Sequence, residues 1–206
     1  IGSGCGMPQK LVAALSERGD QGYDVEVIHL LTFGVAPYAR RELLEHFRHN
    51  ALFIGPNVFQ AVNECVADYT PVSLSEIPAL FREKKIHVDI ALIQVTPPDQ
   101  HGFCSLGISV DVTKAAVESS NYVVAEVNPN MPRTLGDSFI HVNDIDALVE
   151  SDLPILEHEM GPISPEAAKI GEFVASLVDN GSTLQTGIGE IPSAVLAALM
   201  DKKDLG

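Results

Sequence analysis

Two short glycine-rich stretches, one near each end of the chain, carry backbone chemistry suited to binding an anion. Residues 2–8 read Gly-Ser-Gly-Cys-Gly-Met-Pro, and residues 187–192 read Gly-Ile-Gly-Glu-Ile-Pro. In both, apolar residues follow at the same offsets from the proline. A glycine turn that enters a helix aims backbone N–H groups and the positive end of the helix dipole at an anion or a developing oxyanion. The duplication predicts two related α/β halves, each with proline at the first helical position.

The second stretch is the stronger candidate for a ligand site. A strand over residues 183–186 should deliver it to the following helix, so that its amides line an anion or oxyanion site. A tight turn that binds nothing stays open, because a bare Gly-x-Gly is a weak indication. Glu190 lies near the positive end of the helix dipole, which lowers a carboxyl pKa, and we interpret it as a helix-dipole residue. The candidate ligand-binding residues are Gly187, Ile188, Gly189, Glu190 and Ile191.

The first stretch places Cys5 near a helix N-terminus. A thiol pKa can fall there, and the thiolate can act as a nucleophile. No His or Asp stands at an informative spacing to activate it, so a small residue chosen for space is the favoured interpretation. The candidate pocket residues in this stretch are Gly4, Cys5, Gly6, Met7 and Pro8.

A third candidate follows the most apolar strand of the chain, residues 88–95. Open α/β sheets place ligands at the carboxyl ends of their strands, and the next segment contains Pro98, Asp99, His101 and Gly102. The imidazole and the carboxylate could titrate or orient a substrate, although loop His and Asp residues are also common turn formers. Neither a Gly-x-Ser-x-Gly elbow nor a Walker lysine loop occurs, which leaves serine-hydrolase and P-loop functions without support.

These stretches need a framework to position them, and the alternation of helical and apolar strand patterns supplies one. It predicts an α/β fold with a largely parallel sheet flanked by helices. We place a boundary in the extended stretch 153–165, giving domains at residues 1–160 and 161–206, the second of them truncated. Predicted strands span residues 24–31, 51–54, 88–95, 122–127 and 183–186. Predicted helices begin at Pro8 and at Pro165, the latter capped by Ser164, and span residues 36–47, 56–67, 76–84 and 110–120.

Composition limits the partners. The net charge of −15 over 206 residues disfavours nucleic acid and anionic membranes, which attract clustered Lys and Arg. No apolar run approaches the roughly 20 residues that span a bilayer. The three cysteines are widely spaced and lack metal-type clustering, so we expect reduced thiols in a cytoplasmic compartment and no metal site.

Several segments together resemble the acetyl-CoA hydrolase/transferase family, which belongs to the class I CoA-transferases. The resemblance implies a CoA-transferase (NagB/RpiA-like) fold and an acyl-CoA:carboxylate CoA-transferase or acyl-CoA hydrolase, with transfer favoured. Acyl-CoA and a short-chain carboxylate would be substrates, with no permanently bound cofactor. The segments are the first glycine stretch, Gly-Pro-Asn-Val at 55–58, residues 88–107 with their Pro-Pro-Asp-Gln-His-Gly core, and residues 183–199.

The resemblance also implies where the chemistry resides. Residues 187–191 would contact CoA and help to form the oxyanion site. The family's nucleophile is a glutamate that forms an acyl-glutamyl anhydride and then a glutamyl-CoA thioester. It lies in a Gly-Ile-His-(Ser/Thr)-Glu stretch whose first residue matches Gly206. We therefore expect no catalytic residue within residues 1–206, which would be an N-terminal fragment without turnover of its own.

Two other functions stay open. Asp24 lies about 20 residues after the first glycine loop, the spacing of the acidic residue in NAD-binding dinucleotide modules. That acid should close the second strand, however, whereas Asp24 opens one. A non-catalytic oligomerisation domain is the third possibility, and a homo-oligomer would also suit an enzyme.

Overall fold

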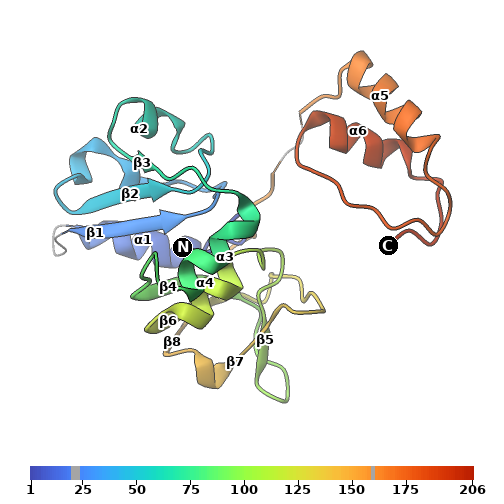
Figure 1. The fold of residues 1–206 in the computed structure, drawn as a ribbon. Helices are drawn as coiled ribbons and strands as arrows, with labels where there is room; N and C mark the ends of the chain where they lie inside the picture. The colour runs from blue at the N-terminus through green and yellow to red at the C-terminus, as the bar shows by residue number, and fades with distance from the viewer. Residues whose placement is uncertain (20–23, 159–160) are drawn as a thin grey trace. The chain divides into compact units, whose positions relative to one another are not determined.

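The computed structural model describes residues 1–19, 24–158 and 161–206. They form two compact units, Ile1–Glu157 and His158–Gly206, each with its own fold (Figure 1). The predicted domain boundary between residues 160 and 161 adjoins residues 159–160, which lie outside the described ranges.

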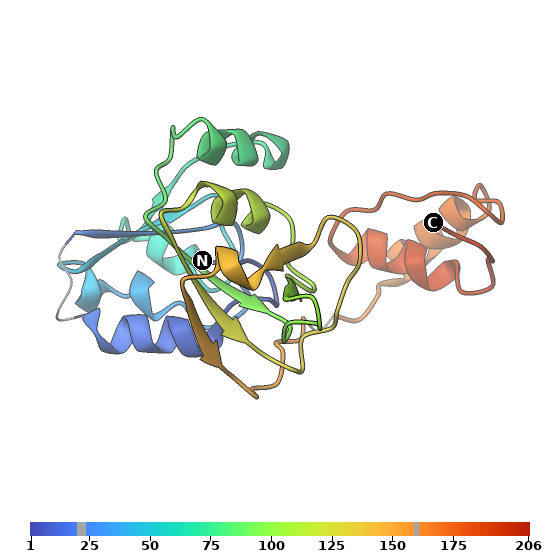
Figure 2. The same cartoon turned by 90° about the horizontal axis from the view of Figure 1, so that it is seen from below.

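The first unit begins with a small parallel sheet in the order β1-β2-β3. Its strands are β1 (Val25–His29), β2 (Phe47–Ala51) and β3 (Asp68–Tyr69), and its helices are α1 (Gln9–Glu17) and α2 (Phe59–Asn63). The chain alternates between strand and helix because parallel strands need a crossover connection. Helix α1 lies along one face of this sheet (Figure 2). The shared core consists of Met7, Val12, Val27, Tyr38, Ala39, Phe47, Ala51 and Val58.

A second parallel sheet has the order β4-β6-β8. Its strands are β4 (Ile90–Val95), β6 (Tyr122–Val127) and β8 (Ala147–Glu150). Helices α3 (Ile77–Arg82) and α4 (Thr113–Ser119) lie side by side in both views (Figures 1 and 2). These helices and the first sheet share a core of Leu52, Ile77, Phe81, Val112 and Ala115.

An antiparallel pair completes the first unit. It consists of β5 (Phe103–Ser105) and β7 (Phe139–His141), with Cys104 opposite Ile140. Both of these central side chains are buried in the core of the β4-β6-β8 sheet. The remaining short elements are 3-10 turns at η2 (Pro37–Ala39), η3 (Arg41–Leu43), η4 (Leu74–Glu76) and η5 (Val142–Asp144).

The predicted helix over residues 36–47 is wrong. Two 3-10 turns replace it, and they are separated by Arg40 in an extended conformation, with φ −84° and ψ 147°. The predicted strand at 51–54 forms four residues earlier, as β2. Alternate burial of Phe47, His49 and Ala51 fixes this strand. In the sequence, Phe47 and Ala51 are apolar residues four positions apart with polar residues between them, and this spacing imitates a helical pattern.

Other predicted elements are confirmed with shifted ends. The strand at 122–127 matches β6, and the strand at 88–95 contains β4, while residues 76–84 and 110–120 contain α3 and α4. The predicted helix at 56–67 forms only as the short α2. The α/β class with parallel strands is confirmed, although the described strands divide between two parallel sheets and one antiparallel pair.

The second unit contains α5 (Pro165–Ala175) packed against α6 (Glu190–Ala198). Ser164 caps α5 as predicted, because its Oγ accepts the N–H of Ala167 at 3.2 Å. The predicted strand at 183–186 is wrong. That segment makes only isolated backbone bonds with the chain end, such as Leu184 N–H to the Gly206 carbonyl at 2.8 Å, and these do not form a ladder.

Both predicted proline positions shift by one or two residues. Pro8 precedes the first residue of α1, and Pro192 is the third residue of α6. Either place is compatible with a helix, because the first-turn N–H groups have no intrahelical partner. No described helix is long and apolar enough to cross a membrane.

Candidate functional site

The first glycine loop packs tightly against the segment that follows β5. Gly4 forms an isolated parallel bridge to Thr32. A Cβ at Gly6 would lie 2.5 Å from the Cβ of Ser109, so the close approach requires glycine. Ser109 Oγ donates to the Ser3 carbonyl at 2.7 Å. Cys5 is half-buried beside these contacts, and the loop is therefore fixed by its neighbours.

Two buried polar side chains hold the end of this loop and the start of α1, and a third, Asn128, contacts one of them. Glu126 Oε2 accepts the N–H of Lys10 at 2.8 Å and that of Leu11 at 3.4 Å. Gln94 Nε2 donates to the Met7 carbonyl at 2.9 Å, and Gln94 Oε1 accepts from Asn128 Nδ2 at 2.8 Å.

Sequence reasoning did not find Gln94, Glu126 and Asn128 as candidates. The signal was present, because Gln94 and Glu126 face each other in register at the carboxyl ends of β4 and β6. A polar pair at that position of otherwise apolar strands marks the sheet edge where α/β proteins bind ligands.

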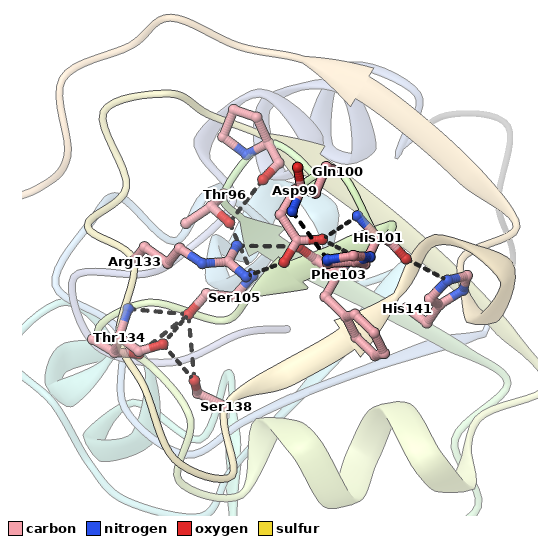
Figure 3. A network of polar contacts seen from close by, with 11 residues as sticks. Thr96, Asp99, Gln100, His101, Phe103, Ser105, Arg133, Thr134, Ser138 and His141 are labelled. Atoms are coloured by element: carbon pink, nitrogen blue, oxygen red, sulfur yellow. Dashed lines mark hydrogen bonds and ion pairs between the residues drawn. The ribbon is translucent and has the colours of Figure 1, made fainter.

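The loop after β4 is organised by Asp99 (Figure 3). Its Oδ1 accepts the N–H groups of His101 and Phe103, both at 2.9 Å, and its Oδ2 accepts from Arg133 Nη2 at 2.7 Å. The Phe103 N–H, followed by the His101 N–H and the Arg133 guanidinium, lowers the pKa of Asp99, while desolvation acts the other way. Asp99 therefore stays a carboxylate at neutral pH.

Ser105 ties this loop to the segment before β7. Its Oγ accepts the N–H of Gly107 at 3.1 Å and that of Thr134 at 3.2 Å, and it lies 3.4 Å from Ser138 Oγ. Figure 3 shows Ser105, Thr134 and Ser138 gathered below the Asp99–Arg133 pair. Two loops distant in the sequence thus form one network.

His101 and Gly102 occupy the outer turn of the same loop. Gly102 has a φ of +83°, a conformation that favours glycine. The carbonyl of His101 accepts from His141 Nε2 at 3.1 Å, and the His101 imidazole is exposed. Pro98 is exposed as well. Asp99 acts as a turn former here, one of the two roles the sequence left open.

A cavity of about 960 Å³ opens beside the first glycine loop. Its volume lies in the range of small-molecule pockets. Met7 brings the loop to the cavity, whereas residues 98–102 are not among its described lining. The lining comprises Met7, Gln9, Val12, Ala13, residues 33–37, residues 39–42, Asn57, Gln60, Ala61, Glu64, Val66 and Leu156.

Polar and charged side chains line part of the cavity wall, among them Asn57, Arg41 and Glu64. Asn57 Nδ2 donates to Thr32 Oγ1 and to the Gly34 carbonyl, both at 2.8 Å. Arg41 forms an ion pair with Glu64 at 3.6 Å. Asn57 therefore fixes the 32–34 segment.

A buried aromatic cluster supports the wall from behind. His29 Nδ1 lies 2.8 Å from the Tyr38 hydroxyl, and the rings of His29 and His49 pack edge to face at 4.3 Å. Burial lowers the pKa of His29 and lowers that of His49 to about 4. Both imidazoles are therefore neutral at pH 7, and the cluster acts as core.

The second glycine loop lies in the other unit. Gly189 has a φ of +126°, and Glu190 is the first residue of α6. Glu190 Oε1 accepts the N–H of Ser164 at 2.6 Å, and this contact with Ser164 lowers the Glu190 pKa. Gly187, Ile188 and Ile191 are exposed. The predicted effect on Glu190 is thus present, with a specific hydrogen bond as its cause.

No cluster of three or more potential metal ligands occurs among residues 1–19, 24–158 and 161–206. Cys104 is buried, Cys5 half-buried and Cys65 exposed, and none of them forms a disulfide.

In the first unit, parallel strands, a glycine loop before a helix and a cavity beside that loop define an α/β domain with a candidate small-molecule site. Residues 1–157 match the N-terminal domain of the acetyl-CoA hydrolase/transferase family, and the chain belongs to this family.

Curated relatives agree over almost the whole chain. A 4-hydroxybutyrate coenzyme A transferase of Clostridium kluyveri is 51% identical over 98% of this chain and 47% of its own length. A succinyl-CoA:acetate/propanoyl-CoA:succinate CoA transferase of Fasciola hepatica is 46% identical over 100% of this chain and 43% of its own length. The chain thus spans about half the length of the curated relatives it matches.

Solved structures share the fold. A 4-hydroxybutyrate CoA-transferase from Porphyromonas gingivalis superimposes with a TM-score of 0.82 at 36% identity, covering 100% of this chain and 47% of the other. RipA from Yersinia pestis superimposes with a TM-score of 0.87 at 29% identity, and the match covers 100% of this chain and 50% of the RipA chain. These matches do not favour the dinucleotide-binding alternative.

Proposed function

We propose that the whole protein is an acyl-CoA:carboxylate CoA-transferase. The observation that carries this proposal is the 51% identity to a 4-hydroxybutyrate coenzyme A transferase over nearly the whole chain. A cavity of small-molecule size beside a glycine loop supports it. Hydrolysis of acyl-CoA is the second candidate, since the family name covers both reactions.

The proposed chemistry is covalent. A glutamate carboxylate, expected just after Gly206, attacks the thioester carbonyl, and the C–S bond breaks to give an acyl-glutamyl anhydride and CoA thiolate. The thiolate then attacks the glutamyl carbonyl, which releases the first carboxylate and leaves a glutamyl-CoA thioester. An incoming carboxylate reverses these steps. Each step is easier than a direct transfer.

The two units supply different parts of this proposal. In the first, Met7 and the cavity wall would hold the acyl chain, and the loop bearing Pro98, Asp99, His101 and Gly102 would form part of the pocket. In the second, the α6 amides at residues 187–191 would contact CoA and stabilise an oxyanion, as helix N-termini do for anions.

Partners and location complete the proposal. CoA thioesters and short-chain carboxylates are the substrates, no cofactor is held permanently, and the enzyme works in the cytoplasm. The odd number and wide spacing of the three cysteines support a reducing compartment.

The test uses the full-length protein. Incubation with acetyl-CoA, reduction with borohydride and peptide mass spectrometry should reveal one reduced glutamate within a few residues after Gly206. Exchange of labelled acetate into acetyl-CoA should accompany it. Free CoA released without an acceptor would favour hydrolysis, and a modified residue elsewhere would refute the assigned nucleophile.

A further inference from the structure

The anion site at the start of α1 is already filled by the protein. Glu126 is fully buried, and its Oε2 accepts two first-turn N–H groups of this nine-residue helix, from Lys10 and Leu11. We propose that Glu126 is an internal anion that occupies this site and positions the first glycine loop for the reaction. The expected effect of Glu126 on the reaction rate rests on the proposed function. The binding of the Glu126 side chain to the start of α1 does not rest on it.

The start of α1 faces this carboxyl group, because both N–H donors to its Oε2 belong to the first turn of the helix. The Lys10 ammonium points elsewhere, donating to the Glu150 carbonyl at 3.1 Å and lying 4.0 Å from Asp152. Glu126 Oε1 is buried with no partner in the described part of the chain. A buried charge needs compensation, and here the α1 amides and dipole provide it.

The same contact places the cavity wall. Lys10 and Leu11 follow Met7 within one helical turn, and the Met7 carbonyl is held by Gln94, the register partner of Glu126. Met7 lines the cavity. Loss of the Glu126 carboxylate would release α1 and the loop together.

The second glycine loop differs. Among the described residues, no carboxylate accepts a hydrogen bond from the first-turn amides of α6, and the acid of that loop, Glu190, bonds to Ser164 instead. Two similar sequence patterns thus have different occupants. The carboxylate of Glu126 occupies the first helix start, whereas the acid of the second loop bonds to a residue outside its own helix.

The experiment empties the first site and refills it. In the full-length protein, Glu126→Ala removes the carboxylate and leaves two unpaired N–H groups. Nitrate is planar, anionic and not an acyl acceptor, so it can replace the carboxylate without entering the reaction. We expect nitrate, titrated against chloride at constant ionic strength, to raise the thermal unfolding midpoint of Glu126→Ala and to restore part of its kcat/KM.

Three controls make the result specific. Wild type and Glu150→Ala, which alters an exposed glutamate of β8, measure the difference between nitrate and chloride that does not depend on Glu126, and the effect in Glu126→Ala should exceed it. Glu126→Gln keeps the shape and one acceptor but removes the charge. It should lose about 10- to 100-fold in kcat/KM, the value of hydrogen bonds to a charged group, and nitrate should not restore it because the site stays filled.

The outcomes separate the two proposals. No nitrate effect on a folded Glu126→Ala protein overturns the internal anion. If Glu126→Ala does not fold, the Glu126→Gln enzyme provides the test. Wild-type values of kcat and KM in that enzyme would also overturn the internal anion. A wild type without CoA transfer, combined with a nitrate-dependent midpoint in Glu126→Ala, refutes the proposed function and leaves the internal anion standing.

Discussion

Alanine at Gly6 tests whether the tight packing of the first glycine loop sets the geometry of the site. The new Cβ would lie 2.5 Å from the Cβ of Ser109 and 3.3 Å from the Ser3 carbonyl oxygen, whereas ordinary contacts begin at 3.4 Å. Neither neighbour is the end of a flexible side chain, so the loop must move by about 1 Å, at a cost of about 1–3 kcal/mol. We expect a lower unfolding midpoint in the full-length Gly6→Ala protein.

Two substitutions at Ser109 isolate the clash. Ser109→Ala removes the hydroxyl, which lies 2.7 Å from both Ser3 Oγ and the Ser3 carbonyl, but keeps the Cβ. Ser109→Gly removes both. In a double-mutant cycle, Gly6→Ala should lower the unfolding free energy when residue 109 is alanine. It should change that free energy little when residue 109 is glycine.

Catalysis should report the same movement. A displacement of about 1 Å at a positioning loop can reduce a rate by about 100-fold. The kcat/KM of Gly6→Ala for CoA transfer should therefore fall, and Ser109→Gly should restore it more than Ser109→Ala does. An equal cost of Gly6→Ala in all three Ser109 backgrounds would show that the Cβ contact does not set the loop.

Three further outcomes follow from other contacts. Asp99→Asn should flatten the acid side of a plot of unfolding midpoint against pH. The pKa of Asp99 is lowered in the folded protein, so its stabilisation is present above the ordinary pKa of an aspartate and is lost as the pH falls through the folded-state pKa. Burial of neutral His49 lowers its pKa to about 4, so the wild type loses about 3 kcal/mol of stability as the pH falls from 6.5 to about 4. His49→Phe should remove this loss from the profile of stability against pH. An unchanged profile in the Asp99 or the His49 variant would contradict the pKa shift assigned to that residue. Gly34→Ala places a Cβ 2.1 Å from Met7 Cε in the cavity wall, so Met7 must shift, and kcat/KM should fall more for longer acyl-CoA substrates than for acetyl-CoA, as a chain-length series would measure.

Strands that form apolar runs could be predicted from the sequence. β6 has the predicted bounds, because an apolar run between a helix and an irregular segment has few other solutions. Residues 36–47 could not be predicted in the same way. There, the placement of Tyr38 and Phe47 in one core decides between helix and turns, and that core depends on residues far along the chain.

The candidate loops could be located from their glycines and prolines, but their occupants could not. Asp99 is surrounded by partners from its own loop and from Arg133, 34 residues later. Glu126 is marked as a polar residue in an otherwise apolar strand, but its role could not be predicted, because its partners lie 116 and 115 residues earlier.

A glycine loop at a helix start therefore indicates only that backbone N–H groups are available there. Which group they bind depends on residues elsewhere in the chain. In the first unit, the deciding residue is Glu126, one position before the end of β6 and in register with Gln94 of β4. Such a carboxylate lies at the sheet edge that faces the start of a helix in parallel α/β folds. In this chain an acidic residue near the end of a neighbouring strand occupies the helix start, so a glycine loop before a helix does not by itself mark a ligand site.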